Sequence, residues 1–146
     1  RGTDLEPQAR AMYQFHTGND VVETGFVPHP TIADCGASPD GLVGEDGLVE
    51  IKVPNTATHI ATLRGGGIDD KYVKQMHLQM LCTGRKWCDF VSFDDRLPEP
   101  MQLHIERVHL DADLAREMEA EIASFLRELD ATVADLTTRY LVKEAA

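Results

Sequence analysis

Two short stretches, Ser38-Pro39-Asp40-Gly41-Leu42 and Leu48-Val49-Glu50-Ile51-Lys52-Val53-Pro54, decide how this sequence is interpreted. Glycines between them predict a tight turn, so the two stretches are expected to pair as a β-hairpin. Successive side chains of a strand point to opposite faces, which places Glu50 and Lys52 on one face and the apolar residues between them on the other. The hairpin would also bring Asp40 beside Glu50.

Two carboxylates that converge in this way form the kind of site that a hard cation such as Mg²⁺ or Mn²⁺ accepts. Metal ions held by carboxylates can polarise a phosphate and generate hydroxide, while a lysine stabilises charge on the reacting oxygens. Asp40, Glu50 and Lys52 therefore favour phosphodiester hydrolysis.

The composition limits the other possibilities. The chain has 146 residues, a net charge of -11 and three cysteines without a CxxC pair. One domain over residues 1–146 is expected, in a reducing cytoplasmic compartment. No apolar stretch approaches the roughly 20 residues of a membrane span. The acidic balance argues against a basic nucleic-acid module, so contact with DNA should be local or assisted by metal ions.

Periodicity and turn residues predict the other elements. A capping box at Thr3 is expected to start a first helix that ends at Gly18. Further helices are expected from a cap at Thr56 to Leu63, from a cap at Asp69 or Asp70 to about Cys82, and over residues 111–140. Strands are expected at residues 21–27, 32–37, 42–43, 48–53, 87–93 and 101–109. The predicted class is α/β, a mixed sheet flanked by helices with a long amphipathic helix at the C-terminal end of the same domain.

The sequence resembles the PD-(D/E)XK nucleases, and within them the lambda exonuclease and YqaJ-type viral recombinase group. The matching pieces are Arg1-Gly2-Thr3 through Glu6, Ala9-Arg10, the two stretches quoted above, and Tyr72 through Gln75. The resemblance implies a restriction-endonuclease-like core. It also implies that a segment upstream of this chain carries the pocket for a terminal 5'-phosphate.

The resemblance further implies an activity and its partners. The expected enzyme is a Mg²⁺-dependent 5'-to-3' exonuclease, with Mn²⁺ as a substitute, that resects linear double-stranded DNA from its ends. It would release 5'-mononucleotides and leave 3' single strands for an annealing protein in phage-type recombination. The relatives form ring-shaped homotrimers, and a phage or prophage in a bacterial cell would encode such a chain.

Roles for individual residues follow from the same resemblance. Asp40 and Glu50 are expected to bind the metal together with the backbone carbonyl of Ile51, and Lys52 to position the attacking water. Glu6 and Gln75 match further active-site positions. Ser38 and Lys52 are expected to contact DNA. Arg64 is a further candidate for this contact because it stands beside a flexible glycine loop and not because of the resemblance, and the segment could equally be only a loop.

Other interpretations of the same residues stay open. Asp40 suits a turn, Glu50 and Lys52 could form a solvated ion pair, and the capping box explains Glu6. Gln75 shares a helical face with Tyr72 and Gln79, and that face could point to solvent. The alternative functions are a structure-specific or restriction-like endonuclease and a non-catalytic scaffold for an annealing protein. An intact set of Asp40, Glu50 and Lys52 argues against the scaffold.

Overall fold

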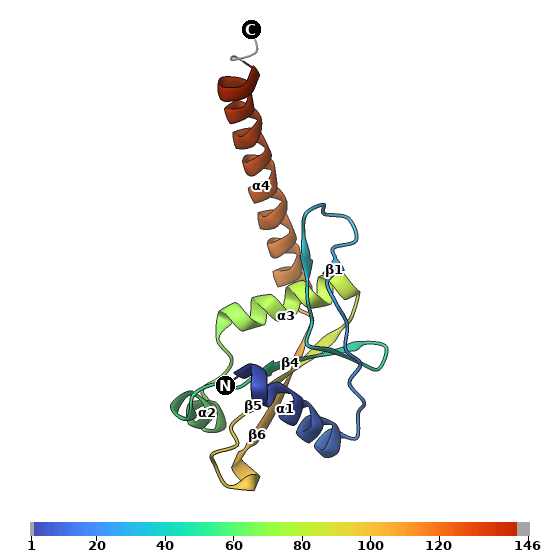
Figure 1. The fold of residues 1–146 in the computed structure, drawn as a ribbon. Coiled ribbons are helices and arrows are strands. Elements are labelled where there is room, and N and C mark those ends of the chain that lie inside the picture. The colour runs from blue at the N-terminus through green and yellow to red at the C-terminus, as the bar shows by residue number, and fades with distance from the viewer. Residues whose placement is uncertain (1, 143–146) are drawn as a thin grey trace. The chain divides into compact units, whose positions relative to one another are not determined.

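A computed structural model describes residues 2–142 of the chain. It divides into two compact units, Arg1–Asp111 and Ala112–Ala146, which are described separately. Figure 1 follows the chain from α1 in the first unit to α4 in the second. The prediction that they form a single nuclease domain stays a prediction.

A four-stranded mixed sheet forms the centre of the first unit. Its order is β3 (Gly41–Val43), β4 (Gly47–Lys52), β5 (Trp87–Phe93) and β6 (Leu103–His109). The outer pairs are antiparallel, whereas β4 and β5 are parallel. Parallel neighbours need a long crossover, and α2 (Thr56–Leu63) and α3 (Asp70–Thr83) provide it. The predicted α/β class and mixed sheet are confirmed.

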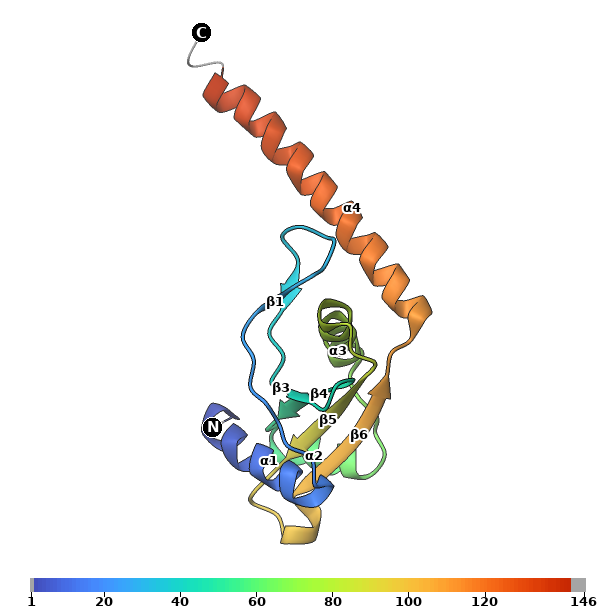
Figure 2. The ribbon, with the colours of Figure 1, turned by 90° about the vertical axis from the view of Figure 1, so that its right-hand side faces the viewer.

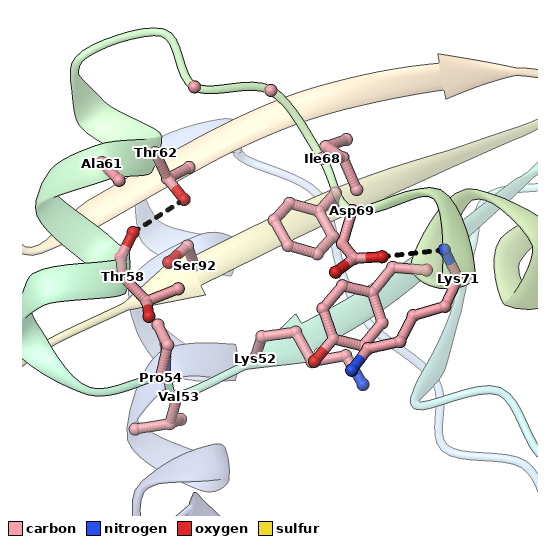
Figure 3. Close-up of a pocket in the computed structure, with 14 residues that line it drawn as sticks. Lys52, Val53, Pro54, Thr58, Ala61, Thr62, Ile68, Asp69, Lys71 and Ser92 are labelled. Atoms are coloured by element: carbon pink, nitrogen blue, oxygen red, sulfur yellow. Dashed lines mark hydrogen bonds between the residues drawn. The ribbon is translucent and has the colours of Figure 1, made fainter.

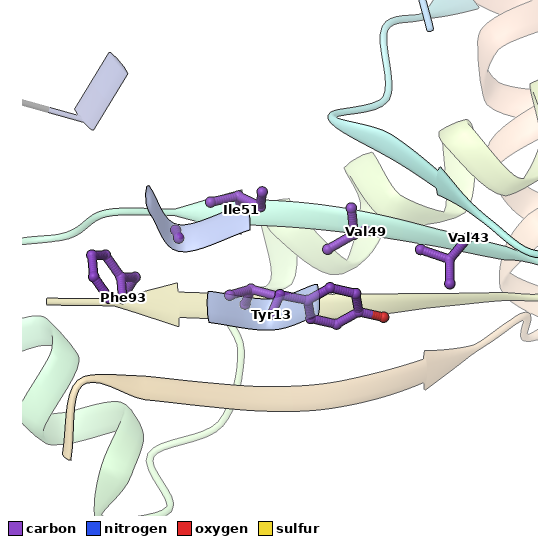
Figure 4. Close-up of a cluster of buried hydrophobic side chains, with 7 residues drawn as sticks. Tyr13, Val43, Val49, Ile51 and Phe93 are labelled. Carbon is purple, nitrogen blue, oxygen red and sulfur yellow. The ribbon is translucent and has the colours of Figure 1, made fainter. Parts of the chain in front are cut away.

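Helices cover both faces of this sheet. Figure 2 shows α1 (Gly2–Thr17) and α3 on opposite sides of the strands. On the α1 side lies a first core, shown in Figure 4, made of Ala9, Tyr13, Val43, Val49, Ile51, Val91 and Phe93. On the α3 side lies a second core made of Leu48, Met76, Met80, Cys88 and Phe90. Strand β4 thus alternates between two buried faces, and Glu50 faces α3, the side on which Leu48 is packed.

Local polar groups set the ends of the helices. The side chain of Asn55 accepts a hydrogen bond from the backbone N–H of Thr58 at 2.8 Å, so Asn55 caps α2 and the predicted cap at Thr56 is wrong by one residue. Asp69 caps α3 as predicted, and Gly84 ends that helix with a φ of 71°. Gly18, with a φ of 72°, follows the last residue of α1.

The first turn of α1 differs from the predicted capping box. The helix already begins at Gly2, so Thr3 lies inside the helix and does not precede it. The side chain of Thr3, like residue Arg1 of the quoted motif, lies outside the described part of the chain.

The strands predicted at residues 21–27 and 32–37 are wrong in extent. Here the chain forms only β1 (Val27–Pro28) and β2 (Gly36–Ala37), with one isolated bridge from Val22 to Leu42. Pro30, two residues after β1, lacks the N–H that would extend the ladder toward the loop. The loop after β1 is closed by local bonds, since the N–H of His29 donates to the carbonyl of Cys35 at 2.7 Å. The two segments therefore pair over only two residues each.

The second unit consists of α4 (Ala112–Thr137), continued by a π-helical turn over Thr138–Val142. The long helix predicted for residues 111–140 is therefore present. Several side chains of its apolar stripe are exposed, among them Phe125, Leu129, Val133 and Leu136. Among the residues the structure describes, no helix is long and apolar enough to span a membrane.

Candidate active site

The hairpin of β3 and β4 brings Asp40 to Glu50. Gly41 pairs with Val49, so Asp40, one residue before β3, comes opposite Glu50. The carboxylate of Asp40 accepts a hydrogen bond from the backbone N–H of Ile51 at 2.8 Å. This bond holds the Asp40 side chain against β4, so the predicted proximity of Asp40 to Glu50 is confirmed. Asp40 therefore does more than form a turn.

Glu50 is buried, with 7% of its surface exposed, and both of its carboxylate oxygens are engaged. One oxygen lies 3.1 Å from the amino group of Lys52. The other accepts a hydrogen bond of 2.7 Å from the side-chain amide of Gln79. The amino group of Lys52 also lies 4.3 Å from the centre of the Tyr72 ring, a distance suited to a cation–π contact. Glu50 and Lys52 are therefore not a freely solvated pair.

The electrostatics of the site show an excess of negative charge. Burial and the nearby charge of Glu50 raise the pKa of Asp40 from 3.8 to about 6, although the N–H of Ile51 and the charge of Lys52 oppose the shift. Glu6 also raises this pKa, which brings it within electrostatic range of Asp40. A cation bound between the two carboxylates would reduce the repulsion between their charges.

The chemistry of these donors fits a hard divalent cation. Asp40 and Glu50 provide carboxylate oxygens, and the buried amide oxygen of Gln79 has no hydrogen-bond partner among the described residues. Across residues 2–142, no three acidic, histidine or cysteine side chains are grouped closely enough to hold an ion by themselves. Mg²⁺ suits such a set because it is held by one or two carboxylates and keeps several waters.

A pocket of about 290 Å³ opens beside these groups, and it collects several of the predicted residues. Its lining includes Ser38, Glu50, Lys52, Gln75 and Gln79. The face of α3 that carries Gln75 and Gln79 thus lies against the site, although Gln75 itself is exposed. Four predicted site residues, together with Gln79 from the same helical face, therefore border one cavity.

Four predicted residues lie outside this lining. Two are Asp40 and Ile51, which are joined by the hydrogen bond described above, and the others are Glu6 and Arg64. Glu6 forms an ion pair with Arg10 at 3.3 Å on α1, and its link to the site is the electrostatic one to Asp40. Arg64 is the exposed C-cap residue of α2 and does not border the pocket. The structure therefore brings Glu6 near the site but leaves Arg64 apart from it.

Gln79 and Tyr72 contact the central residues of the site, although the sequence analysis did not assign either of them to it. Gln79 binds Glu50 directly, and Tyr72 contacts Lys52. The signal for both was their helical spacing from Gln75, which places all three side chains on one face of α3.

Fold and site together define a class. A mixed sheet that presents an aspartate, a glutamate and a lysine from a hairpin, covered by helices on both faces, is the core of the PD-(D/E)XK superfamily. A family model described as the YqaJ-like viral recombinase domain matches residues 1–86, and the chain belongs to this family.

Solved structures are similar over the whole chain. An alkaline exonuclease from Laribacter hongkongensis, LHK-Exo, is 53% identical, with a TM-score of 0.95, and the match covers 100% of this chain and 74% of that one. LHK-Exo in complex with dAMP gives the same identity and coverage with a TM-score of 0.94.

A phage-related exonuclease from Haemophilus somnus 129PT is 15% identical, with a TM-score of 0.68 over 92% of this chain and 71% of that one. At this identity the likeness shows the fold alone. A search of curated proteins found no match. The chain is thus a homologue of exonucleases.

Proposed function

We propose that the chain is the catalytic domain of a Mg²⁺-dependent 5'-to-3' exonuclease that resects linear double-stranded DNA. It would release 5'-mononucleotides and leave 3' single strands for an annealing protein. The observation that carries the proposal is that the hairpin brings Asp40 beside Glu50, which lines one pocket together with Lys52, in a chain that is 53% identical to an alkaline exonuclease. The dAMP bound by that relative is a deoxynucleoside monophosphate, the class of product that such an enzyme would release.

Different residues of the site would bind the metal ion and position the attacking water. Asp40 and Glu50, with the backbone carbonyl of Ile51, would hold Mg²⁺ or Mn²⁺. The bound ion supplies Lewis acidity toward the phosphate and lowers the pKa of water. Lys52, held by Glu50 and Tyr72, would position the attacking water and stabilise negative charge on the phosphate oxygens.

Other groups would support this centre. Gln79 orients the Glu50 carboxylate through its 2.7 Å hydrogen bond, and Gln75 faces the same pocket, where it could orient a water or a phosphate oxygen. Glu6 adds negative charge near Asp40 and would strengthen cation binding. Ser38 and Lys52 are proposed to contact the DNA backbone at the pocket, and Arg64 to contact it outside the pocket.

The proposal extends to the assembly. In the bacterial cytoplasm, the whole nuclease domain would act as a ring-shaped homotrimer encoded by a phage or prophage, as the family resemblance implies. The chain's net charge of -11 gives little general attraction for DNA, so a ring would keep the enzyme on its substrate where charge does not.

The test uses linear duplex DNA labelled separately at its 5' and 3' ends, incubated with Mg²⁺, Mn²⁺ or a chelator. We expect early, metal-dependent loss of the 5' label alone, and none with Lys52→Ala. Lys74→Ala is the matched control, because Lys74 is an exposed lysine that pairs with Asp70 on the same helix as Gln75. Early loss of the 3' label would overturn the direction.

Two outcomes would favour the alternatives. Cutting of covalently closed circular DNA would favour a structure-specific or restriction-like endonuclease. The absence of cleavage with either ion would favour a non-catalytic scaffold for an annealing protein.

A further inference from the structure

A second and larger cavity, of about 560 Å³, lies next to the pocket that contains Glu50. It is formed by the C-terminal half of α2, the glycine-containing loop at residues 65–67, and the first turn of α3, as Figure 3 shows. Lys52 borders both cavities, so the two adjoin at this side chain. Its volume is within the range typical of pockets for small organic ligands.

The middle of this cavity is apolar and aromatic. Ile68, Tyr72 and Phe90 contribute to its lining, and the rings of Tyr72 and Phe90 stack at 6.0 Å with an angle of 28° between their planes. Pro54 and Val53 extend the lining from the end of β4. Such a surface suits a flat aromatic ligand.

Most polar groups in the lining are already engaged within the protein. The hydroxyl of Ser92 bonds to the buried ring of His59 at 2.7 Å. The carboxylate of Asp69 caps α3, and the hydroxyl of Thr62 donates to the carbonyl of Thr58 at 3.1 Å. The cavity therefore offers few polar atoms that could select one aromatic ring over another.

Two cations stand at one side of the cavity. The amino groups of Lys52 and Lys71 lie 4.3 Å and 5.0 Å from the centre of the Tyr72 ring. Figure 3 shows both side chains ending at the same side, away from Thr58 and Thr62 on α2. Two amino groups that both contact the Tyr72 ring give this side of the cavity positive charge, which suits an anion such as a phosphate.

The glycine loop keeps the cavity open. A side chain at Gly66 would lie 2.8 Å from the carbonyl oxygen of Ala61, and Gly65 and Gly67 have φ angles of 86° and 76°. The loop can therefore fold back against α2 only because these residues are glycine. Without side chains, it forms a wall that does not fill the space.

We propose that this cavity binds one nucleotide of the DNA strand, the one next to the phosphate that is hydrolysed. Its base lies against Ile68, Tyr72 and Phe90, and its phosphate lies between Lys52 and Lys71. An aromatic wall with few selective polar atoms accepts any base, as a nuclease that must digest all sequences requires. The inference rests on the proposed function for its substrate, because it assigns this subsite to the same DNA strand.

The test measures binding of dAMP and of deoxyribose 5-phosphate by calorimetry, in chelator, so that no cleavage is needed. We expect dAMP to bind about tenfold more tightly than deoxyribose 5-phosphate, because only dAMP carries a base to stack. Ala61→Trp, which fills the cavity, should weaken dAMP binding about tenfold, and Lys71→Ala should weaken the binding of both ligands. The matched controls are Ala57→Trp, an exposed position on α2 outside the lining, and Lys74→Ala. Circular dichroism and melting temperature establish that each variant is folded.

Several results would overturn the assignment. They are the absence of dAMP binding at millimolar concentration, equal binding of the two ligands, or dAMP binding that Ala61→Trp leaves unchanged. Failure of the proposed function is a separate result. A protein that binds dAMP with the expected variant pattern but cleaves no DNA keeps the subsite and loses the nuclease assignment. If the protein cleaves DNA but Ala61→Trp leaves dAMP binding unchanged, the nuclease assignment stands and the subsite assignment is wrong.

Discussion

At the scale of single residues, the site is a balance between two carboxylates and one lysine. Asp40 and Glu50 lie close together and partly buried, and Lys52 is the cation that contacts Glu50. Such an arrangement costs stability in the metal-free protein and would regain it when a cation binds.

The first prediction concerns Asp40→Asn. The folded-state pKa of Asp40, about 6, lies above its ordinary value of 3.8, so its contribution to stability is full below pH 3.8 and is lost as the pH rises through 6. At pH 8 without metal, Asp40→Asn should therefore melt at a higher temperature than the parent protein, and the difference should shrink at pH 5. Adding Mg²⁺ should raise the melting temperature of the parent but not of the variant. A lower melting temperature for the variant at pH 8 would contradict the claim that the charges of Asp40 and Glu50 repel each other in the metal-free protein.

The second prediction concerns Gln79→Met, which removes the amide but keeps a side chain of similar length. Without its 2.7 Å hydrogen bond, Glu50 loses the group that orients it, so the Mg²⁺ concentration for half-maximal cleavage should rise about 10- to 100-fold. A titration of cleavage rate with Mg²⁺ measures this. Lys74→Ala should leave the titration unchanged, whereas an unchanged titration for Gln79→Met would make the hydrogen bond incidental.

At the scale of elements, a buried polar network joins helix α1 to the sheet. The hydroxyl of Tyr13 donates to Asp89 at 2.6 Å, and the guanidinium of Arg107 donates to both oxygens of the same carboxylate at 2.8 and 3.1 Å. Arg107 also lies 3.6 Å from the centre of the Trp87 ring. Burial and the hydrogen bond to Asp89 raise the pKa of Tyr13, which keeps this hydroxyl a donor. The network thus connects α1, β5 and β6.

The third prediction compares two substitutions in this network by urea denaturation. Tyr13→Phe removes one hydrogen bond and should cost about 1 kcal/mol of unfolding free energy, because Asp89 keeps its two bonds to Arg107. Asp89→Ala removes all three bonds and leaves the buried hydroxyl of Tyr13 without this acceptor, so it should cost more, about 2 to 3 kcal/mol. Equal costs for the two would mean that Asp89 is not the centre of the network.

Elements also differ in how far the sequence could predict them. The hairpin of β3 and β4 and the end of α3 at Gly84 were predictable because they depend on neighbours in sequence. The cap of α2 was predicted one residue late, since Asn55 and Thr56 are both good capping residues. The segment from 21 to 37 was not predictable from its apolar runs, because whether a strand forms depends on which donors and acceptors a distant neighbour offers.

At the scale of the whole molecule, charge dominates. The chain carries a net charge of -11 and must still approach a polyanion if it acts on DNA. Bound divalent ions would offset the carboxylates at the point of contact.

The fourth prediction therefore concerns DNA binding by Lys52→Ala, which we expect to bind without cleaving. Its affinity for a duplex end should be about tenfold higher in Mg²⁺ than in chelator, because ions at the site reduce repulsion of the phosphates. Fluorescence anisotropy with a labelled duplex measures this. The double variant with Asp40→Asn should lose most of the difference, and the same Mg²⁺ effect in both proteins would place it outside the site.

The sequence by itself determined the candidate centre. Asp40, Glu50 and Lys52 were predictable because a short hairpin and the alternation of one strand bring them together, and both are local geometry. Only the tertiary structure decided what surrounds them. The contacts of Gln79 with Glu50 and of Tyr72 with Lys52 depend on how α3 packs on the sheet. The cavity between α2 and α3 depends on the path that the crossover from β4 to β5 takes over the sheet. Packing between segments distant in sequence follows from the filling of a shared core, and no spacing within one segment encodes it.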